Sequence, residues 1–249
     1  MTSAISYAKT VAVLGWMQLV GGKGDFSDLK KETAMVFENQ IPRDVCVDIR
    51  CRIDEMADKE DDDRVWRDAI GSDTRILAFE SLIPEYIHYL KIQERIRAID
   101  DYLGSKTRSW FLMANRVLPK LGNLGSGGGL HRDSPFSHQV KCIWYLSDVT
   151  AENGPFQYVP GSNFSVLGDR HKYPLGKYRF GSIQDTPVDV LAPAGSLLVA
   201  DVKAIHAGKP IESGARYALT LYTYKSAEKS RESFREQGVD PSRVQPEIA

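Results

Sequence analysis

The stretch "DVKAIHAGKPIESGARYALTLYTY", residues 201–224, contains two apolar, strand-like segments joined by a turn rich in Gly and Pro. Successive side chains in a strand point to opposite faces, so the second segment places Arg216, Thr220 and Tyr222 on one side. Gly and Pro are the residues that most readily reverse a chain direction. Antiparallel pairing across this turn is expected to bring the guanidinium of Arg216 close to the imidazole of His206.

Similar short segments fill the chain from residue 108 onward. They are rich in β-branched, aromatic and aliphatic residues, and turn signals such as Asn153-Gly154 and Pro160-Gly161 separate them. The segments are "RSWFLMANRVL", "HQVKCIWYLSDV", "FQYVPG", "PVDVLAP", "SLLVADVKAIH" and "RYALTLYTYK". No helical pattern lies between them, which disfavours parallel βαβ units and favours an antiparallel sandwich or barrel.

The first hundred residues have a different pattern, with apolar residues at near-helical spacing. In "SLIPEYIHYLKIQERIRAIDDYLG", residues 81–104, Pro84 suits a first helical turn and Gly104 suits a helix end. At the other end of the chain, the polar residues after Lys225 are expected to form a short helix followed by a loose end. The sequence therefore predicts one domain, mainly β with flanking helices: a mostly helical part (1–104), a β-rich core (105–225) and a polar tail (226–249).

Charge and composition restrict the partners. The chain has 32 Lys and Arg residues against 33 Asp and Glu residues, so no excess positive charge attracts nucleic acid or an anionic membrane. The apolar run Val11–Val20 is shorter than the roughly 20 apolar residues that a bilayer span needs. The three cysteines lack metal-type pairing, which favours a reduced, cytoplasmic chain. A small-molecule substrate is the expected partner.

A glycine-rich stretch, "GSGGGLHRDSP" at residues 125–135, leads into a possible metal site. His131 and Asp133 are two residues apart, so in a strand they point to a common side. The glycines suit a sharp turn or the close approach of a ligand. A phosphate-binding P-loop is disfavoured because no Gly-Lys-Ser/Thr and helix follow. His131, Asp133 and His206 together form a set of two histidines and one carboxylate, which is typical of non-haem Fe(II) oxygenases.

An ordered series of motifs resembles the phytanoyl-CoA dioxygenase-like group of Fe(II)/2-oxoglutarate dioxygenases. The series is His131-x-Asp133, Asn153-Gly154-Pro155, Pro160-Gly161-Ser162, His206 and Arg216, and the likeness covers about residues 108–225. The resemblance implies a double-stranded β-helix, or jelly roll, with Fe(II) held by His131, Asp133 and His206. It also implies that Arg216 pairs with the distal carboxylate of 2-oxoglutarate, and that O2 is consumed with release of succinate and CO2. Asp133 disfavours a halogenase, since halogenating relatives have a small residue there.

One position departs from the family pattern. Some relatives carry a serine two residues after the second histidine, which helps to hold 2-oxoglutarate, whereas this chain has Gly208. Thr220 or Tyr222 is expected to supply a hydroxyl instead. Asn115 and Gln139, on strands expected to flank the pocket, are candidate donors to the other carboxylate of the co-substrate.

The substrate itself is less well defined by the sequence. The segment 163–185 has Arg170, Lys172, Lys177 and Arg179 against Asp169 and Asp185. Together with Arg132 beside the metal site, this excess of positive charge suggests a substrate with an anionic group. Lysines and arginines that only face solvent would give the same sequence pattern.

Other functions use the same ligand set. A jelly-roll isomerase, epimerase or hydrolase would hold zinc or another divalent ion at these residues, and a non-catalytic jelly roll would only bind a small molecule. Arg216 favours the oxygenase, because a hydrolase needs no clamp for a second carboxylate.

Overall fold

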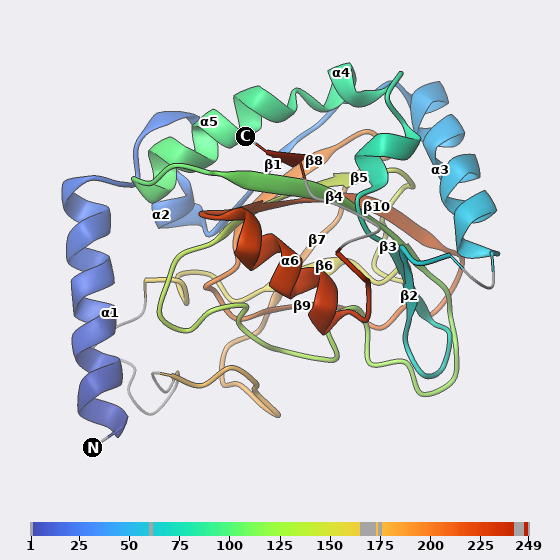
Figure 1. Cartoon of the computed structure of the whole chain (residues 1–249). Helices are drawn as coiled ribbons and strands as arrows, with labels where there is room; N and C mark the ends of the chain where they lie inside the picture. The colour runs from blue at the N-terminus through green and yellow to red at the C-terminus, as the bar shows by residue number, and fades with distance from the viewer. Residues whose placement is uncertain (1, 60–61, 165–172, 174–175, 242–246, 249) are drawn as a thin grey trace.

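The computed structural model describes residues 2–59, 62–164, 173, 176–241 and 247–248 (Figure 1). Its strands are β1 (Ala34–Phe37), β2 (Val65–Arg67), β3 (Asp73–Ile76), β4 (Ser109–Val117), β5 (Val140–Tyr145), β6 (Phe156–Tyr158), β7 (Val188–Val190), β8 (Leu197–Asp201), β9 (His206–Gly208), β10 (Arg216–Tyr224) and β11 (Glu247–Ile248). Its helices are α1 (Thr2–Leu19), α2 (Leu29–Glu32), α3 (Arg43–Ala57), α4 (Ile87–Leu90), α5 (Ile92–Leu103) and α6 (Ala227–Glu236). Two short 3-10 turns lie at Gly24–Phe26 and Phe79–Leu82.

The strands form two antiparallel sheets. The larger has the order β1-β8-β5-β10-β4-β3-β2, with β11 also paired to β4, and the smaller has the order β7-β6-β9. Strands β4 and β10 are the longest, at nine residues each, and pair along their whole length from Arg216↔Val117 to Tyr224↔Ser109. The antiparallel sandwich predicted from the short apolar segments is therefore present.

Alternation along the central strands divides the larger sheet into two faces. One face presents Trp144, Leu112 and Leu219 to a core shared with helices α3 and α5, and all three side chains are fully buried. The helices cover this face of the sheet in Figure 1. Residues of the opposite parity, including Arg216 and Thr220, point to the other side, where the smaller sheet lies.

The first 104 residues contain mostly helices, but they also contribute three short strands that the sequence pattern did not indicate. Strand β1 pairs with β8, and β3 pairs with β4, so this part of the chain forms both edges of the larger sheet. These strands have three or four residues each, too short for a clear period-two pattern. Their pairing depends on distant strands, which no local pattern reports.

The helix expected over residues 81–104 is divided in two. Lys91 has φ 49°, a left-handed conformation that ends α4 and begins α5. Pro84 lies before α4 and not in a first helical turn. Gly104 ends α5 with φ 61°, as predicted, because glycine adopts this conformation without steric cost.

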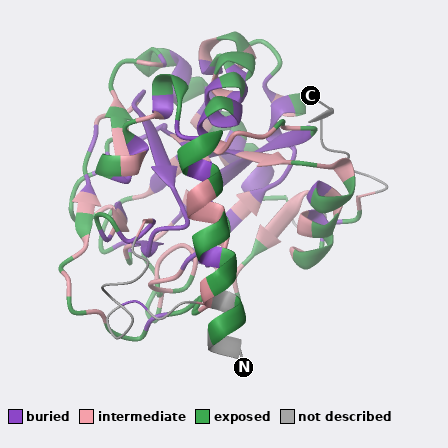
Figure 2. Cartoon of the chain, turned by 90° about the vertical axis from the view of Figure 1, so that its left-hand side faces the viewer, coloured by how far each residue is buried: buried purple, intermediate pink, exposed green. Residues whose placement is uncertain are grey.

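Helices α1 and α6, near the two ends of the chain, lie on the outside of the sandwich (Figure 1). Helix α1 is largely exposed (Figure 2), and within the described part of the chain no helix combines the length and apolarity needed to span a membrane. Helix α6 confirms the short helix predicted in the tail, but the loose end expected after it contains the two-residue strand β11, which pairs with β4. Ser226 caps α6 by accepting from the amide of Lys229, and Phe234 packs edge-on against Phe111 at 4.7 Å between ring centroids.

Candidate metal and co-substrate site

His131 and His206 are direct neighbours across an isolated antiparallel bridge. The amide of His131 donates to the carbonyl of His206 at 2.8 Å, and the amide of His206 donates back at 2.9 Å. His206 is the first residue of β9. This strand pairs with β6, where Tyr158 lies opposite His206. Opposed residues of an antiparallel bridge project to the same face, so the two imidazoles converge.

Asp133 completes a group of three ligand atoms. Its Oδ1 lies 3.3 Å from Nε2 of His131 and 3.6 Å from Nε2 of His206, and these atoms all lie within 4.8 Å of one another. Nδ1 of His131 lies 2.8 Å from the Gly129 carbonyl, and Nδ1 of His206 lies 2.9 Å from the Ala204 carbonyl. A carbonyl only accepts, so each Nδ1 carries the proton and each Nε2 keeps its lone pair for a metal.

Burial and nearby charges support a divalent cation at these atoms. Burial lowers the pKa of His206, which favours the neutral imidazole that a metal ligand must be. Burial alone would raise the pKa of the Asp133 carboxyl, but the Lys141 ammonium and the two histidines hold it well below its usual range. Two neutral nitrogens and one carboxylate oxygen are a donor set that suits iron.

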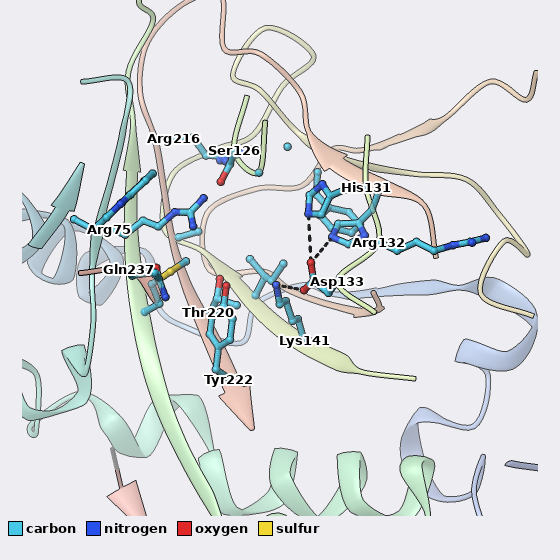
Figure 3. A pocket seen from close by; sticks show the side chains of 18 of the residues that line it. Arg75, Ser126, His131, Arg132, Asp133, Lys141, Arg216, Thr220, Tyr222 and Gln237 are labelled. Carbon is cyan, nitrogen blue, oxygen red and sulfur yellow. Dashed lines mark ion pairs between the residues drawn. The ribbon is translucent and has the colours of Figure 1, made fainter. Parts of the chain in front are cut away.

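Lys141 is the direct partner of the carboxylate ligand. Its Nζ forms an ion pair with Oδ2 of Asp133, and the same ammonium lies 4.6 Å from the centroid of the Tyr222 ring. Figure 3 shows Lys141 below Asp133 and His131 above it. The ion pair leaves Oδ1 as the oxygen that faces the histidines.

The glycines before His131 permit close packing against the metal ligands. Gly127 has φ 87°, and a Cβ placed on it would lie 2.4 Å from Cε1 of His131. Gly125 has φ 76°, and a Cβ there would lie 1.9 Å from the carbonyl oxygen of Gly208 in β9. Both positions therefore need glycine for conformation and for space.

Arg216 is a buried cation at the start of β10, with only 5% of its surface exposed. Its Nη1 donates to the carbonyl of Gly154, which lies in the Asn153-Gly154 turn. Burial lowers the pKa of its guanidinium. Among the described residues no carboxylate forms an ion pair with Arg216. A buried cation without a carboxylate partner is costly, and an anionic ligand would remove that cost.

The metal ligands and Arg216 line one cavity of about 540 Å³. Thr220 and Tyr222 also line it, as the alternation of β10 predicts. Figure 3 shows Arg216 and Ser126 on one side of this space and the metal ligands on the other. The four groups of the sequence motif therefore meet around a common volume.

The departure at Gly208 has a structural explanation. A Cβ at this position would lie 2.9 Å from Cβ of Ser126, and the amide of Gly208 donates to the Ser126 carbonyl at 3.0 Å. Ser126 lines the cavity and its hydroxyl donates to Oδ2 of Asp73 at 3.1 Å. The glycine-rich loop thus occupies the space that a serine at residue 208 would need.

The expected donors Asn115 and Gln139 are placed elsewhere. Among the residues that the structure describes, neither lines this cavity. The amide of Asn115 donates to Oδ1 of Asp73 and to the carbonyl of Thr74. Gln139 is exposed and lines an adjoining pocket, which shares Lys141 and Tyr222 with this cavity. Asn115 does face the cavity side of β4, but its donors are used by the neighbouring strand β3.

The charged loop provides little support for an anionic substrate. Nη1 of Arg179 donates to the carbonyls of Gly127 and Gly128, which fastens the loop to the glycine-rich stretch. Arg132 is buried, donates to the Ser162 carbonyl at 3.3 Å and lies 5.3 Å from the Phe180 ring centroid. Lys177 is exposed. Arg170, Lys172 and Asp169 lie outside the described residues.

Three charged residues of the cavity, Lys141, Arg75 and Glu236, were not identified from the sequence. Lys141 could have been found, because it is an isolated charge at the cavity-facing positions of an apolar strand. Arg75 lies in β3, a strand that the sequence did not reveal, so no signal pointed to it.

A family model described as phytanoyl-CoA dioxygenase (PhyH) matches residues 34–218. The match begins at the first residue of β1 and so extends well before the motifs that carried the resemblance. No curated protein sequence matches the chain significantly.

Several solved structures are similar to the chain. The carbocyclase SnoK from nogalamycin biosynthesis, described as non-haem and alpha-ketoglutarate dependent, has 16% identity and a TM-score of 0.61, covering 88% of this chain and 89% of its own. EvdO2 from Micromonospora carbonacea var. aurantiaca has 17% identity and a TM-score of 0.57, covering 81% and 91%. HygX from Streptomyces hygroscopicus, solved with nickel and 2-oxoglutarate bound, has 14% identity and a TM-score of 0.56, covering 78% and 84%. These similarities confirm the predicted fold class, a jelly-roll core with flanking helices.

Proposed function

The chain belongs to the phytanoyl-CoA dioxygenase family and is an oxygenase of the non-haem iron, 2-oxoglutarate-dependent type, and from this premise we propose that it hydroxylates a small organic molecule. The observation that carries the proposal is the convergence of His131, Asp133 and His206 in a cavity that also contains Arg216, which forms no ion pair with the described residues. A metal site alone would suit many enzymes. The buried cation beside it specifies a ligand that carries a carboxylate.

The three ligand residues hold the metal in this proposal. The fit of iron rests on the donor set, on the two Nδ1 protons directed at backbone carbonyls, and on the fixed Asp133 carboxylate. Bound there, Fe(II) together with 2-oxoglutarate and O2 would supply the oxidant for the substrate, with conversion of the keto acid to succinate and CO2. Lys141 keeps Oδ2 of Asp133 engaged, which directs Oδ1 to the metal.

Arg216 holds the distal carboxylate of 2-oxoglutarate. Its anchoring bond to the Gly154 carbonyl restricts the guanidinium, and its remaining donors are available to an anion. Thr220 shares the cavity-facing side of β10 with Ala218 and Arg216 and is 6% exposed, which supports a role for its hydroxyl as a donor to the co-substrate. Tyr145 and Phe156 exclude water from this end of the cavity.

We also propose a small-molecule substrate and a reducing, cytoplasmic location. Two similar structures, the epimerase SnoN (15% identity, TM-score 0.58) and HygX, were solved with the small molecules nogalamycin RO and hygromycin B, respectively. Cys46, Cys51 and Cys142 are all free thiols. Proteins of a reducing compartment usually keep their cysteines as free thiols.

The test is anaerobic addition of Fe(II) and 2-oxoglutarate, followed by the visible charge-transfer absorption of the chelated pair. We expect the band in the unmodified protein, no band in His131→Ala, and at least about tenfold weaker 2-oxoglutarate binding in Arg216→Met, because a charged hydrogen bond contributes roughly 1.5–3 kcal/mol. Arg116→Met is the matched control, since Arg116 pairs with Asp54 and Asp58 away from the cavity. Absence of the band in the unmodified protein would leave the zinc-type isomerase, epimerase or hydrolase and the non-catalytic binder as the alternatives.

A further inference from the structure

The cavity has a second half that the metal ligands and Arg216 do not use. Trp66 of β2, Arg75 of β3 and Met113 of β4 line it from the larger sheet, and Glu236 and Gln237 line it from the end of α6. In the strand order β5-β10-β4-β3-β2, this wall lies on the far side of β10 from Lys141. Neighbouring strands are about 4.8 Å apart, so the β3 backbone lies roughly 10 Å from that of β10.

We propose that this half of the cavity is the prime-substrate subsite and that Arg75 binds a carboxylate or phosphate group of the substrate there. The proposal rests on the proposed function, which it extends from a small organic molecule to an anionic one. It does not depend on the charged loop at residues 163–185.

The position of Arg75 is restricted on two sides. Its Nε and Nη2 donate to Oδ2 of Asp73 at 3.1 and 2.8 Å, and its guanidinium lies 4.7 Å from the centroid of the Trp66 ring. Asp73 is itself held by donors from Asn115 and Ser126. An arginine fixed along one edge and on one face has lost most of its conformational freedom before any ligand binds.

The opposite edge of Arg75 is the one that can bind a ligand. Nη1 has no hydrogen-bond partner among the described residues. It is not one of the buried atoms that lack a partner, so solvent or a ligand can reach it. The side chain is 19% exposed, and Figure 3 shows its guanidinium directed into the cavity. A carboxylate or phosphate oxygen is the acceptor that matches this planar edge.

The charge of the cavity also favours an anion. Apart from Arg179 of the charged loop, its charged lining residues are Arg75, Arg132, Lys141 and Arg216, against Asp133 and Glu236. Counting the adjacent Asp73 as well, four positive charges face three negative ones. A ferrous ion and dianionic 2-oxoglutarate cancel each other, so the loaded site keeps an excess of positive charge.

The experiment uses full-length protein loaded with Mn(II) and saturating 2-oxoglutarate, and probes of similar size: benzoate, phenyl phosphate and neutral benzyl alcohol. Mn(II) broadens the proton NMR signals of a probe that binds beside it, which gives a dissociation constant for each probe. We expect at least one anionic probe to bind at least about tenfold more tightly than benzyl alcohol, as one charged hydrogen bond provides. Comparison of benzoate with phenyl phosphate distinguishes the carboxylate from the phosphate.

Arg75→Gln is expected to abolish this preference and to leave the affinity for 2-oxoglutarate within about twofold. Arg179→Gln, another lining arginine, is the matched control and should retain the preference. Equal binding of the anions and benzyl alcohol to the unmodified protein would overturn the proposal, as would an unchanged preference in Arg75→Gln. Weaker 2-oxoglutarate binding in Arg75→Gln with unchanged probe binding would assign the residue to the co-substrate instead. Each of these failures leaves the Fe(II) and 2-oxoglutarate band of the unmodified protein intact, so it is distinct from failure of the proposed function.

Discussion

Lys141 holds one oxygen of Asp133 while the other oxygen of the same carboxylate faces both histidines. The two residues come from different parts of the fold, since Asp133 follows the glycine-rich loop and Lys141 lies in β5. The ion pair therefore fastens the metal-binding segment to the central sheet.

We expect Lys141→Met to weaken Co(II) binding to the metal-free protein by about tenfold. Without the ammonium, Asp133 is free to rotate, and loss of a residue that orients a metal ligand typically costs 10- to 100-fold in affinity. Lys141→Arg should recover most of the affinity, because it restores a cationic donor. Isothermal titration with Co(II) measures the effect. Unchanged or tighter binding in Lys141→Met would mean that repulsion between the ammonium and the metal outweighs orientation.

The glycine-rich loop allows a test with two closely matched variants. Gly127 and Gly129 have φ angles of 87° and 90°, so alanine strains the backbone similarly at both. Only at Gly127 would the new Cβ meet the His131 ring, whereas nothing lies within 4 Å of a Cβ at Gly129. We expect Gly127→Ala to lose at least about tenfold more Co(II) affinity than Gly129→Ala, by the same orientation argument. Similar losses in the two variants would refute a specific contact with His131.

Gly208→Ser introduces the residue found in some relatives, and here we expect it to weaken 2-oxoglutarate binding. The new Cβ would lie 2.9 Å from Cβ of Ser126, so the glycine-rich loop must move. Overpacking of this kind typically costs about 1–3 kcal/mol. The double variant Ser126→Gly/Gly208→Ser removes the side-chain part of the clash and should recover part of the affinity. A tighter 2-oxoglutarate complex in Gly208→Ser alone would contradict the prediction.

Lys203 should make stability depend on pH in the alkaline range. It is 3% exposed, its Nζ donates to the Asn163 carbonyl at 2.8 Å, and burial lowers its pKa to about 8. The unfolded chain, with a lysine pKa near 10.4, binds more protons between these two values, so the free energy of unfolding from this group rises with pH. The slope is at most about 1.4 kcal/mol per pH unit.

The difference in unfolding free energy between the unmodified protein and Lys203→Met isolates this contribution. Urea denaturation at pH 7, 8, 9 and 10 should show the unmodified protein gaining stability relative to the variant from about pH 8 upward. A difference that stays constant over this range would show that Lys203 titrates near its ordinary pKa in the folded state.

Local periodicity was sufficient to predict part of the site. His131-x-Asp133 and the alternation of β10 place side chains by the two-residue repeat of a strand, so the convergence of the ligands with Arg216 and Thr220 followed from the sequence pattern and a resemblance. The strand-like segments also predicted the β-rich second half, and the preference for glycine at helix ends predicted the end of α5 at Gly104.

Only the tertiary structure decided which other side chains share the cavity. Arg75 and Asn115 are cross-strand partners. Arg75 nevertheless extends into the cavity, whereas the side-chain amide of Asn115 donates to Asp73. That outcome depends on β3 lying beside β4 in one register, and a shift of one residue would reverse the faces. Strand order and register arise from contacts between residues far apart in the chain. Local patterns describe only neighbours, so together with the resemblance they indicated the three candidate metal ligands but not the wall opposite them.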